Sequence, residues 1–159
     1  MQSEQDMRRI NEQTVRDFLH LLAEKNLDAW ADLWTEDAVQ EMPFSPAGFP
    51  TKIEGRNALL KHYSGLPKAY GAMSFPNLVI YPMLDSSWVL AEFRGEIDVL
   101  VTGRPYNNHY CGLFHLNNGK ISLYREYYNP TVLTEAFGGA SELSQSFTRI
   151  SHKFYDSNL

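Results

Sequence analysis

Residues 117–130 have the sequence NNGKISLYREYYNP, and this stretch decides the fold because it joins a tight turn to a strand. Asn and Gly tolerate the positive φ angles that a tight turn requires. The run after them is rich in Ile, Leu and Tyr, as strands are. Pro130 should end the run, because proline cannot donate to a β-ladder. The stretch therefore predicts a turn followed by one strand of a sheet.

One face of this strand carries the strongest candidate for chemistry. Because side chains alternate along a strand, Ser122, Tyr124, Glu126 and Tyr128 should share one face. A carboxylate between two phenols is paired, solvated or placed for proton transfer. Enclosure by apolar groups would raise its pKa into the range of a general acid or base. An ion pair or a solvated sheet face is the alternative interpretation of Glu126.

The residues before this stretch predict further strands. Runs at 87–102 and 106–116 should form an antiparallel meander with the strand that follows Gly119. Gly95 lies inside the first of these runs and predicts a bulge or a bend. A run at 73–83 is limited by two prolines and predicts an edge strand.

The N-terminal half predicts helices, apart from a short strand at 39–44. Apolar residues at helical spacing predict a helix over 11–25 and a third helix over 58–64. A second, shorter helix should begin near Asp28 and bury Trp34. Helices followed by strands indicate the α+β class. We expect a cone-shaped α+β barrel in which three helices pack on a curved antiparallel (mixed) sheet, with an apolar pocket at its open end.

The totals fit a single globular domain. The 159 residues fit a flexible lead (1–10), one domain (11–137) and a polar tail (138–159). A net charge of −5 without a basic stripe argues against nucleic acid as a partner. No run reaches the roughly 18 apolar residues of a membrane span, so a cytoplasmic protein is expected. A single cysteine, Cys111, excludes a multi-cysteine zinc site, and we expect no metal and no cofactor.

Three other ionisable residues are candidates for catalysis, and two of them have a plainer interpretation. His62 has the intrinsic pKa of a proton shuttle, but a single helical histidine is more often a residue at the edge of the core. Asp98 is a second candidate, and its plainer interpretations are a solvated face or a pair with Arg94. Glu41 is the third candidate. The aromatic candidates for contact with a substrate are Phe18, Trp34, Tyr110, Tyr124 and Tyr128, although the tryptophan also fits a core role.

The order of these elements resembles the nuclear transport factor two-like fold and, within it, the SnoaL-like group. The resemblance rests on the segments LWTEDAV (33–39), EGR (54–56), GRPYN (103–107) and GKISLYREY (119–127). These segments are specific for the fold and not for an activity, because this fold hosts isomerases, cyclases, hydrolases and inert members. The resemblance also implies a homodimer.

This sequence lacks part of the catalytic residues of two enzyme groups within the resemblance. The oxyanion donors of ketosteroid isomerases fall on Phe18 and on Gly112 or Cys111, which cannot replace them, while the base position falls on Glu41. In limonene-type epoxide hydrolases an arginine lies between two acids. Asp98 and Glu126 match the two acids, but the arginine position falls on Glu96, the opposite charge.

The phenazine-biosynthesis A and B proteins are the relatives for which both main groups are retained. Their acid–base pair falls on Glu126 and His62. We therefore expect cofactor-free acid–base catalysis, such as isomerisation, cyclisation or condensation, on a small and largely apolar organic substrate. Two alternatives stay open: a ligand-binding or dimeric assembly module without catalysis, and epoxide hydrolysis through Asp98 and Glu126.

Overall fold

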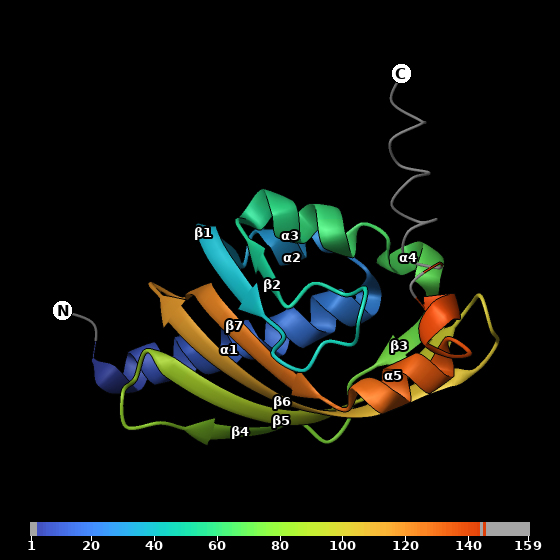
Figure 1. Cartoon of the computed structure of the whole chain (residues 1–159). Helices are drawn as coiled ribbons and strands as arrows, with labels where there is room; N and C mark the ends of the chain where they lie inside the picture. The colour runs from blue at the N-terminus through green and yellow to red at the C-terminus, as the bar shows by residue number, and fades with distance from the viewer. Residues whose placement is uncertain (1–2, 144, 146–159) are drawn as a thin grey trace.

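A long helix lies along one side of a curved sheet in the computed structural model, which describes residues 3–143 and 145 (Figure 1). In chain order the elements are α1 (Glu4–Glu24), α2 (Leu27–Ala31), β1 (Trp34–Glu41), β2 (Lys52–Glu54), α3 (Arg56–Tyr63), α4 (Leu66–Ala69), β3 (Tyr70–Ser74), β4 (Val79–Pro82), β5 (Trp88–Val99), β6 (Pro105–Asn117), β7 (Lys120–Tyr128) and α5 (Pro130–Ala136). Among the described helices, none is long and apolar enough to cross a membrane.

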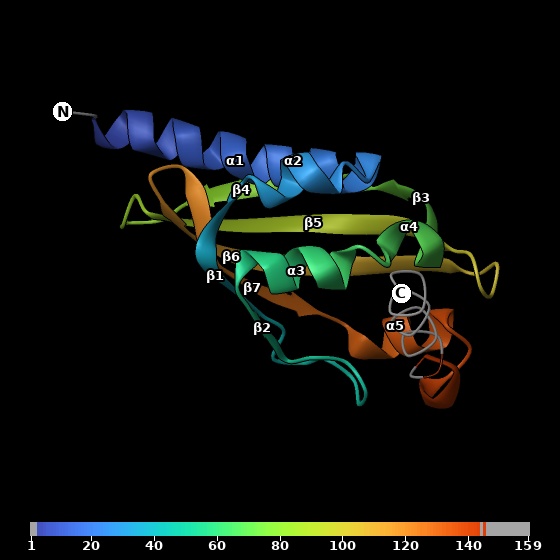
Figure 2. The ribbon, with the colours of Figure 1, turned by 90° about the horizontal axis from the view of Figure 1, so that it is seen from above.

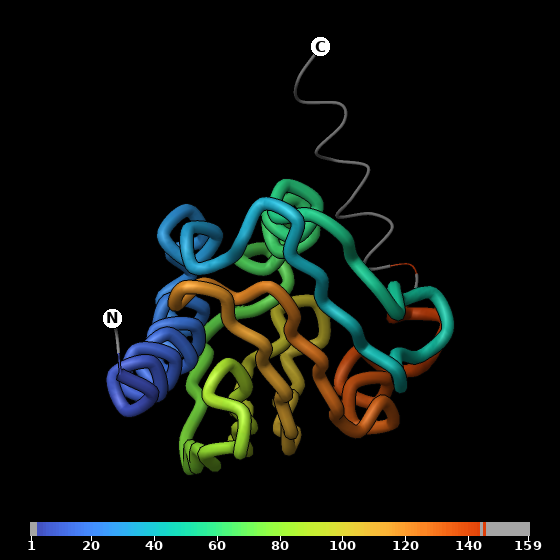
Figure 3. The backbone as a smooth tube through the Cα atoms, turned by 90° about the vertical axis from the view of Figure 1, so that its left-hand side faces the viewer, coloured from blue at the N-terminus to red at the C-terminus, as the bar shows by residue number. Residues whose placement is uncertain are grey.

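The sheet is mixed and unclosed. Its strands are ordered β2-β1-β7-β6-β5-β3, and β4 pairs with β5 beside β3. All pairings are antiparallel except that of β1 with β7, which is parallel. Helices α1, α2 and α3 cover the same concave face, and α5 lies at one end of it (Figures 1 and 2). The predicted α+β class, with helices packed on a curved mixed sheet, is confirmed, although the sheet does not close into a barrel (Figure 3).

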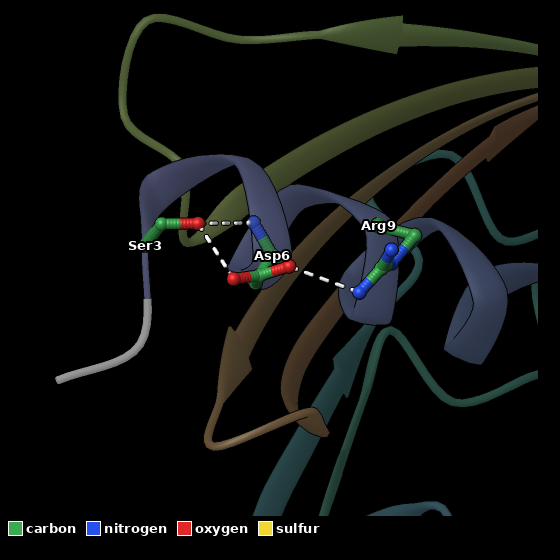
Figure 4. Close-up of polar contacts among 3 residues, drawn as sticks. All are labelled: Ser3, Asp6 and Arg9. Carbon is green, nitrogen blue, oxygen red and sulfur yellow. Dashed lines mark hydrogen bonds and ion pairs between the residues drawn. The ribbon is translucent and has the colours of Figure 1, made fainter.

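The expected flexible lead at 1–10 is wrong from Glu4 onward, because α1 begins there. The Ser3 hydroxyl accepts a hydrogen bond from the Asp6 backbone N–H at 3.1 Å, and Asp6 also pairs with Arg9 at 2.9 Å (Figure 4). A serine cap with acidic residues in the first turn stabilises a helix start without any burial. The apolar stripe begins only at Val15, so periodicity alone could not reveal these first turns.

Trp34 was expected at the end of the second helix, but it opens strand β1. Helix α2 ends at Ala31, and Trp34 pairs with Ile121 of β7. The strand predicted at 39–44 therefore starts earlier and ends at Glu41. This pairing joins segments that are far apart in the sequence, and no local pattern encodes it.

The sheet is irregular at Ser122 and not at Gly95. Strands β5 and β6 stay in register through Gly95, which pairs with Asn108, so the predicted bulge is absent there. Between β6 and β7 the register shifts from His115–Leu123 to Leu116–Ile121, which leaves Ser122 as an extra residue. Alternation had predicted that Ser122 shares the face of Tyr124. Instead, Ser122 hydrogen-bonds to His115 on the outer face.

The run predicted at 73–83 is divided into β3 and β4, with Pro76 between them, and both strands pair with β5. The polar tail expected at 138–159 is only partly tested. Leu143 is fully buried in the core, so the packed unit continues beyond 137. Residues 144 and 146–159 of that tail lie outside the described part of the chain.

An aromatic cluster joins α1 to the concave face of the sheet. The ring centroid of Phe18 lies 5.1–5.9 Å from the rings of Trp30, Trp34, Phe114 and Tyr124, mostly edge to face. All five side chains are almost completely buried. This cluster fills one part of the space between helix and sheet and leaves a hollow next to it.

Candidate functional site

A cavity of about 120 Å³ lies between the concave sheet face and the helices. Its size is comparable to that of apolar cavities, on the order of 150 Å³, that hold one benzene-sized molecule. The wall is largely aromatic and aliphatic. Its polar side chains are His62, Tyr63, Tyr70, Tyr106, Tyr110, Tyr124, Glu126 and Tyr128.

Glu126 supplies the one carboxyl group in the described cavity wall. The group is surrounded by protein, although part of the residue's surface still faces the hollow. Burial raises the pKa of Glu126 to about 7, while a hydrogen bond from the Tyr124 hydroxyl opposes the rise by stabilising the ionised form. A carboxyl group that titrates near neutrality can both accept and donate a proton under the same conditions.

Gly112 creates the space in which Tyr124 reaches Glu126. It is the cross-strand partner of Glu126, and the rings of Phe114 and Tyr124 stack beside it with centroids 4.3 Å apart. A Cβ atom at this position would lie 2.7 Å from Cε2 of Tyr124, a separation that real Cβ atoms do not show. Gly112, the position at which an oxyanion donor of ketosteroid isomerases is missing, therefore permits the close approach of the Tyr124 phenol.

A second polar group lies farther along the same cavity wall. The Tyr110 hydroxyl donates to the Tyr106 hydroxyl at 2.8 Å, and the Asn108 side-chain amide donates to the same oxygen at 3.1 Å. Tyr70 stacks on Tyr106 with ring centroids 6.3 Å apart. The cavity therefore has two polar regions, one around Glu126 and one around Tyr106, joined by apolar walls.

Most of the residues predicted from the sequence do line the cavity. The structure brings together the following predicted residues: Phe18, His62, Tyr110, Tyr124, Glu126 and Tyr128. Burial lowers the pKa of His62, so its imidazole is held in the neutral form. Whether these residues act on a substrate stays a prediction.

Asp98, Glu41 and Trp34 are not in the described cavity wall, so the expectation that they belong to one site with Glu126 is wrong. Asp98 is exposed on the outer sheet face, because its neighbours in β5 point into the core. Glu41 is also on the outer face, where it accepts a hydrogen bond from Nε of Arg125 at 2.6 Å. Trp34 is completely buried in the cluster around Phe18.

Three tyrosines of the cavity wall were missed as site residues. Tyr106 shares the parity of Tyr110 in β6, so alternation could have found it. Tyr63 lies in the segment predicted as the third helix, and its hydroxyl donates to the Gln40 side chain at 2.9 Å. Tyr70 opens β3, next to a short helix that no pattern in the sequence indicated.

Among the described residues, no group of three His, Cys, Asp or Glu side chains is arranged to hold a metal ion. In the part of the wall that the structure describes, no cluster of cationic side chains matches the phosphates of a nucleotide cofactor.

Comparison with known proteins identifies a matching family and several similar proteins. A family model for the SnoaL-like domain matches residues 15–124. The uncharacterized protein YesE of Bacillus subtilis is 39% identical over 128 residues, which are 80% of this chain and 87% of YesE. A crystal structure of a candidate isomerase from Bacillus subtilis is 37% identical, with a TM-score of 0.80, covering 84% of this chain and 96% of that one. A phenazine biosynthesis-related protein of Pseudomonas aeruginosa is 25% identical, with a TM-score of 0.74, over 84% of this chain and 88% of its own.

Proposed function

Because the chain belongs to the SnoaL-like domain family and encloses a carboxyl group in an aromatic cavity, we propose that it catalyses acid–base chemistry, without a cofactor, on a small and largely apolar organic molecule. The observation that carries this proposal is the position of Glu126, whose pKa of about 7 suits it to both halves of a proton transfer. Isomerisation is the simplest reaction of this kind, because one group can remove a proton and return it elsewhere.

The surroundings of Glu126 support this role. Tyr124 donates to the carboxylate and holds its orientation, and the aromatic walls keep bulk water from competing for the proton. His62 lines the same cavity with a neutral imidazole, which can accept or pass on a proton. We assign Glu126 the role of general acid and base, and His62 that of a supporting proton carrier.

The test measures proton exchange, which does not require the natural product to be known. Small organic compounds with weakly acidic C–H bonds are incubated with the protein in D₂O, and deuterium uptake at carbon is followed by NMR. Glu126→Gln keeps the shape of the side chain and removes the titrating proton, so it should slow exchange by about 10²- to 10⁴-fold. Glu41→Gln, a matched change on the outer face, should leave the rate unchanged. Equal rates for the wild type and Glu126→Gln would refute the proposal.

The epoxide-hydrolase alternative is not proposed further. Asp98 and Glu126 lie on opposite faces of the sheet, so the two acids cannot act on one substrate.

A homodimer formed through the outer sheet face is a second, compatible proposal. Val79 and Tyr81 of β4 are large exposed side chains that a second copy could cover, and so is Phe44, which lies in the loop after β1 and packs against Tyr127. Sedimentation equilibrium tests it: a dimer that Tyr81→Glu converts to a monomer supports the outer face as the interface, and a wild-type monomer refutes it.

A further inference from the structure

The orientation of the Asn108 amide is determined by the backbone. Asn108 is 2% exposed, and its Oδ1 accepts the backbone N–H groups of His109 at 2.9 Å and Asn129 at 3.2 Å. Its Nδ2 donates to the Asn129 carbonyl at 2.9 Å and to the Tyr106 hydroxyl at 3.1 Å. The opposite amide orientation would place N–H groups against N–H groups. The Tyr106 oxygen must therefore accept the hydrogen bond from Asn108.

Tyr110 occupies the second acceptor position of the same oxygen. Its hydroxyl donates to that of Tyr106 at 2.8 Å. A tyrosine hydroxyl has one proton to donate and accepts through its oxygen. Within the described part of the chain, the Tyr106 hydroxyl accepts two hydrogen bonds and donates none. Two donors polarise the O–H bond of Tyr106 and leave its proton available to a ligand.

Tyr106 and Tyr110 share the concave face with Glu126 and line the same cavity. Tyr110 is the cross-strand partner of Tyr128, which is two residues beyond Glu126 in β7. Tyr110 and Glu126 are therefore diagonal neighbours, whose Cβ atoms are about 7–8 Å apart. The Tyr106 oxygen lies 2.8 Å from the Tyr110 oxygen, so one small molecule in the shared cavity can contact both polar regions. Gly95 leaves the space that the Tyr110 ring occupies, because a Cβ atom at this position would lie 2.8 Å from Cε2 of Tyr110.

The geometry points to Tyr106 as the hydrogen-bond donor to a carbonyl oxygen, and hence to a small, flat, enolisable carbonyl compound as the substrate class. This inference rests on the role proposed above for Glu126. The carboxylate removes a proton from the carbon next to the carbonyl, the C–H electron pair forms a C=C bond, and the carbonyl π pair moves to oxygen. The resulting enolate oxygen accepts the Tyr106 hydrogen bond. Return of the proton from Glu126 to the far carbon of a conjugated system completes an isomerisation with no co-reactant.

The binding test uses 4-nitrophenol, a flat phenol whose ionised oxygen resembles an enolate oxygen and whose phenolate absorbs visible light. It is performed on Glu126→Gln, so that the charge of the carboxylate does not compete with that of the probe. We expect this variant to bind the phenolate, and addition of Tyr106→Phe should weaken binding by about 10- to 100-fold. Addition of Tyr110→Phe retains the Tyr106 donor and should weaken it by only about 2- to 10-fold. Absence of phenolate binding, or equal affinity with and without the Tyr106 hydroxyl, would overturn the inference.

A matched control separates the hydroxyl from general effects of replacing tyrosine with phenylalanine. Tyr81 donates to Glu92 at 2.9 Å on the outer face, so Tyr81→Phe removes a hydrogen-bonded phenol oxygen far from the cavity. The affinity for 4-nitrophenol should then change by less than about twofold. Thermal unfolding of each variant shows whether it is folded. If Tyr106→Phe does not fold, the Tyr110→Phe variant provides the test.

Failure of this inference can be told apart from failure of the proposed function. In the D₂O exchange assay, Tyr106→Phe in the wild-type background should lower kcat by about 10²- to 10³-fold and change KM much less. Full activity of Tyr106→Phe, with activity lost in Glu126→Gln, would refute the role of Tyr106 alone. Full activity of Glu126→Gln would refute the proposed base, while the 4-nitrophenol titration would still report on Tyr106.

Discussion

Replacing Glu126 with Gln should stabilise the protein, and the gain should depend on pH. Glutamine keeps the shape of the side chain and an oxygen that can accept from Tyr124, but it cannot ionise. In the folded protein, burial raises the pKa of Glu126 from 4.5 to about 7. The unfolded chain has the ordinary value, so the folded state binds this proton more tightly than the unfolded state does.

The sign follows from proton binding. Below about pH 4.5 the carboxyl group is protonated in both states, and the substitution removes no charge. Between pH 4.5 and about 7 the unfolded chain ionises while the folded protein keeps its proton, so stability falls as pH rises. Above about pH 7 Glu126 is ionised in both states, and its burial as a carboxylate lowers the free energy of unfolding by the full amount. The gap between the two pKa values corresponds to about 3 kcal/mol. The figure of about 3 kcal/mol is an upper limit, because Glu126 faces the cavity and is not completely enclosed by protein.

Urea unfolding followed by circular dichroism at about pH 4.5 and about pH 8.5 measures the effect. Glu126→Gln should match the wild type within about 0.5 kcal/mol at the lower pH and exceed it by about 2–3 kcal/mol at the higher pH. Asp98→Asn replaces an exposed carboxylate and should change the free energy of unfolding by less than about 0.5 kcal/mol at both. If the free energies of unfolding of Glu126→Gln and the wild type differ by the same amount at both pH values, the carboxyl group is solvated and the reasoning from burial is wrong.

Four further substitutions test the packing and the boundary of the site. Phe18→Ala should lower the free energy of unfolding by about 3–5 kcal/mol, because it empties the centre of the aromatic cluster, and a loss below about 1 kcal/mol in urea unfolding would contradict that role. Gly112→Ala places a Cβ atom 2.7 Å from Cε2 of Tyr124, so it should cost about 1–3 kcal/mol and slow proton exchange, and wild-type values of both would count against the close approach. Ser3→Ala removes the cap of α1 and should lower stability by about 1 kcal/mol in thermal unfolding, whereas an unchanged value would show that the cap does not contribute. Glu41→Gln breaks a partly exposed ion pair and should cost less than about 1 kcal/mol, and a larger loss would mean that the pair stabilises more than surface pairs do.

Local alternation was enough to place Glu126 with its neighbours. Tyr124, Glu126 and Tyr128 are two residues apart in a strand whose ends are marked by a turn and a proline, so their common face follows from the pleat alone. The apolar stripe from Val15 to Leu22 likewise determined which side of α1 is buried. The α+β class could be predicted for the same reason, since each element carries its own period.

Long-range pairing decided what alternation could not. Each strand has two faces, and only the assembled sheet shows which one covers the core; Asp98 proved to be on the outer face and Tyr106 on the inner one. The parallel pairing of β1 with β7 and the extra residue at Ser122 depend on contacts between distant segments. The donors to Tyr106 come from its own strand, but their orientation depends on the Asn129 backbone of the next loop. The sequence by itself determined the faces of single strands and helices, because their periods are local; the tertiary structure decided which faces meet around the cavity, because that depends on burial and hydrogen bonds between segments far apart in the chain.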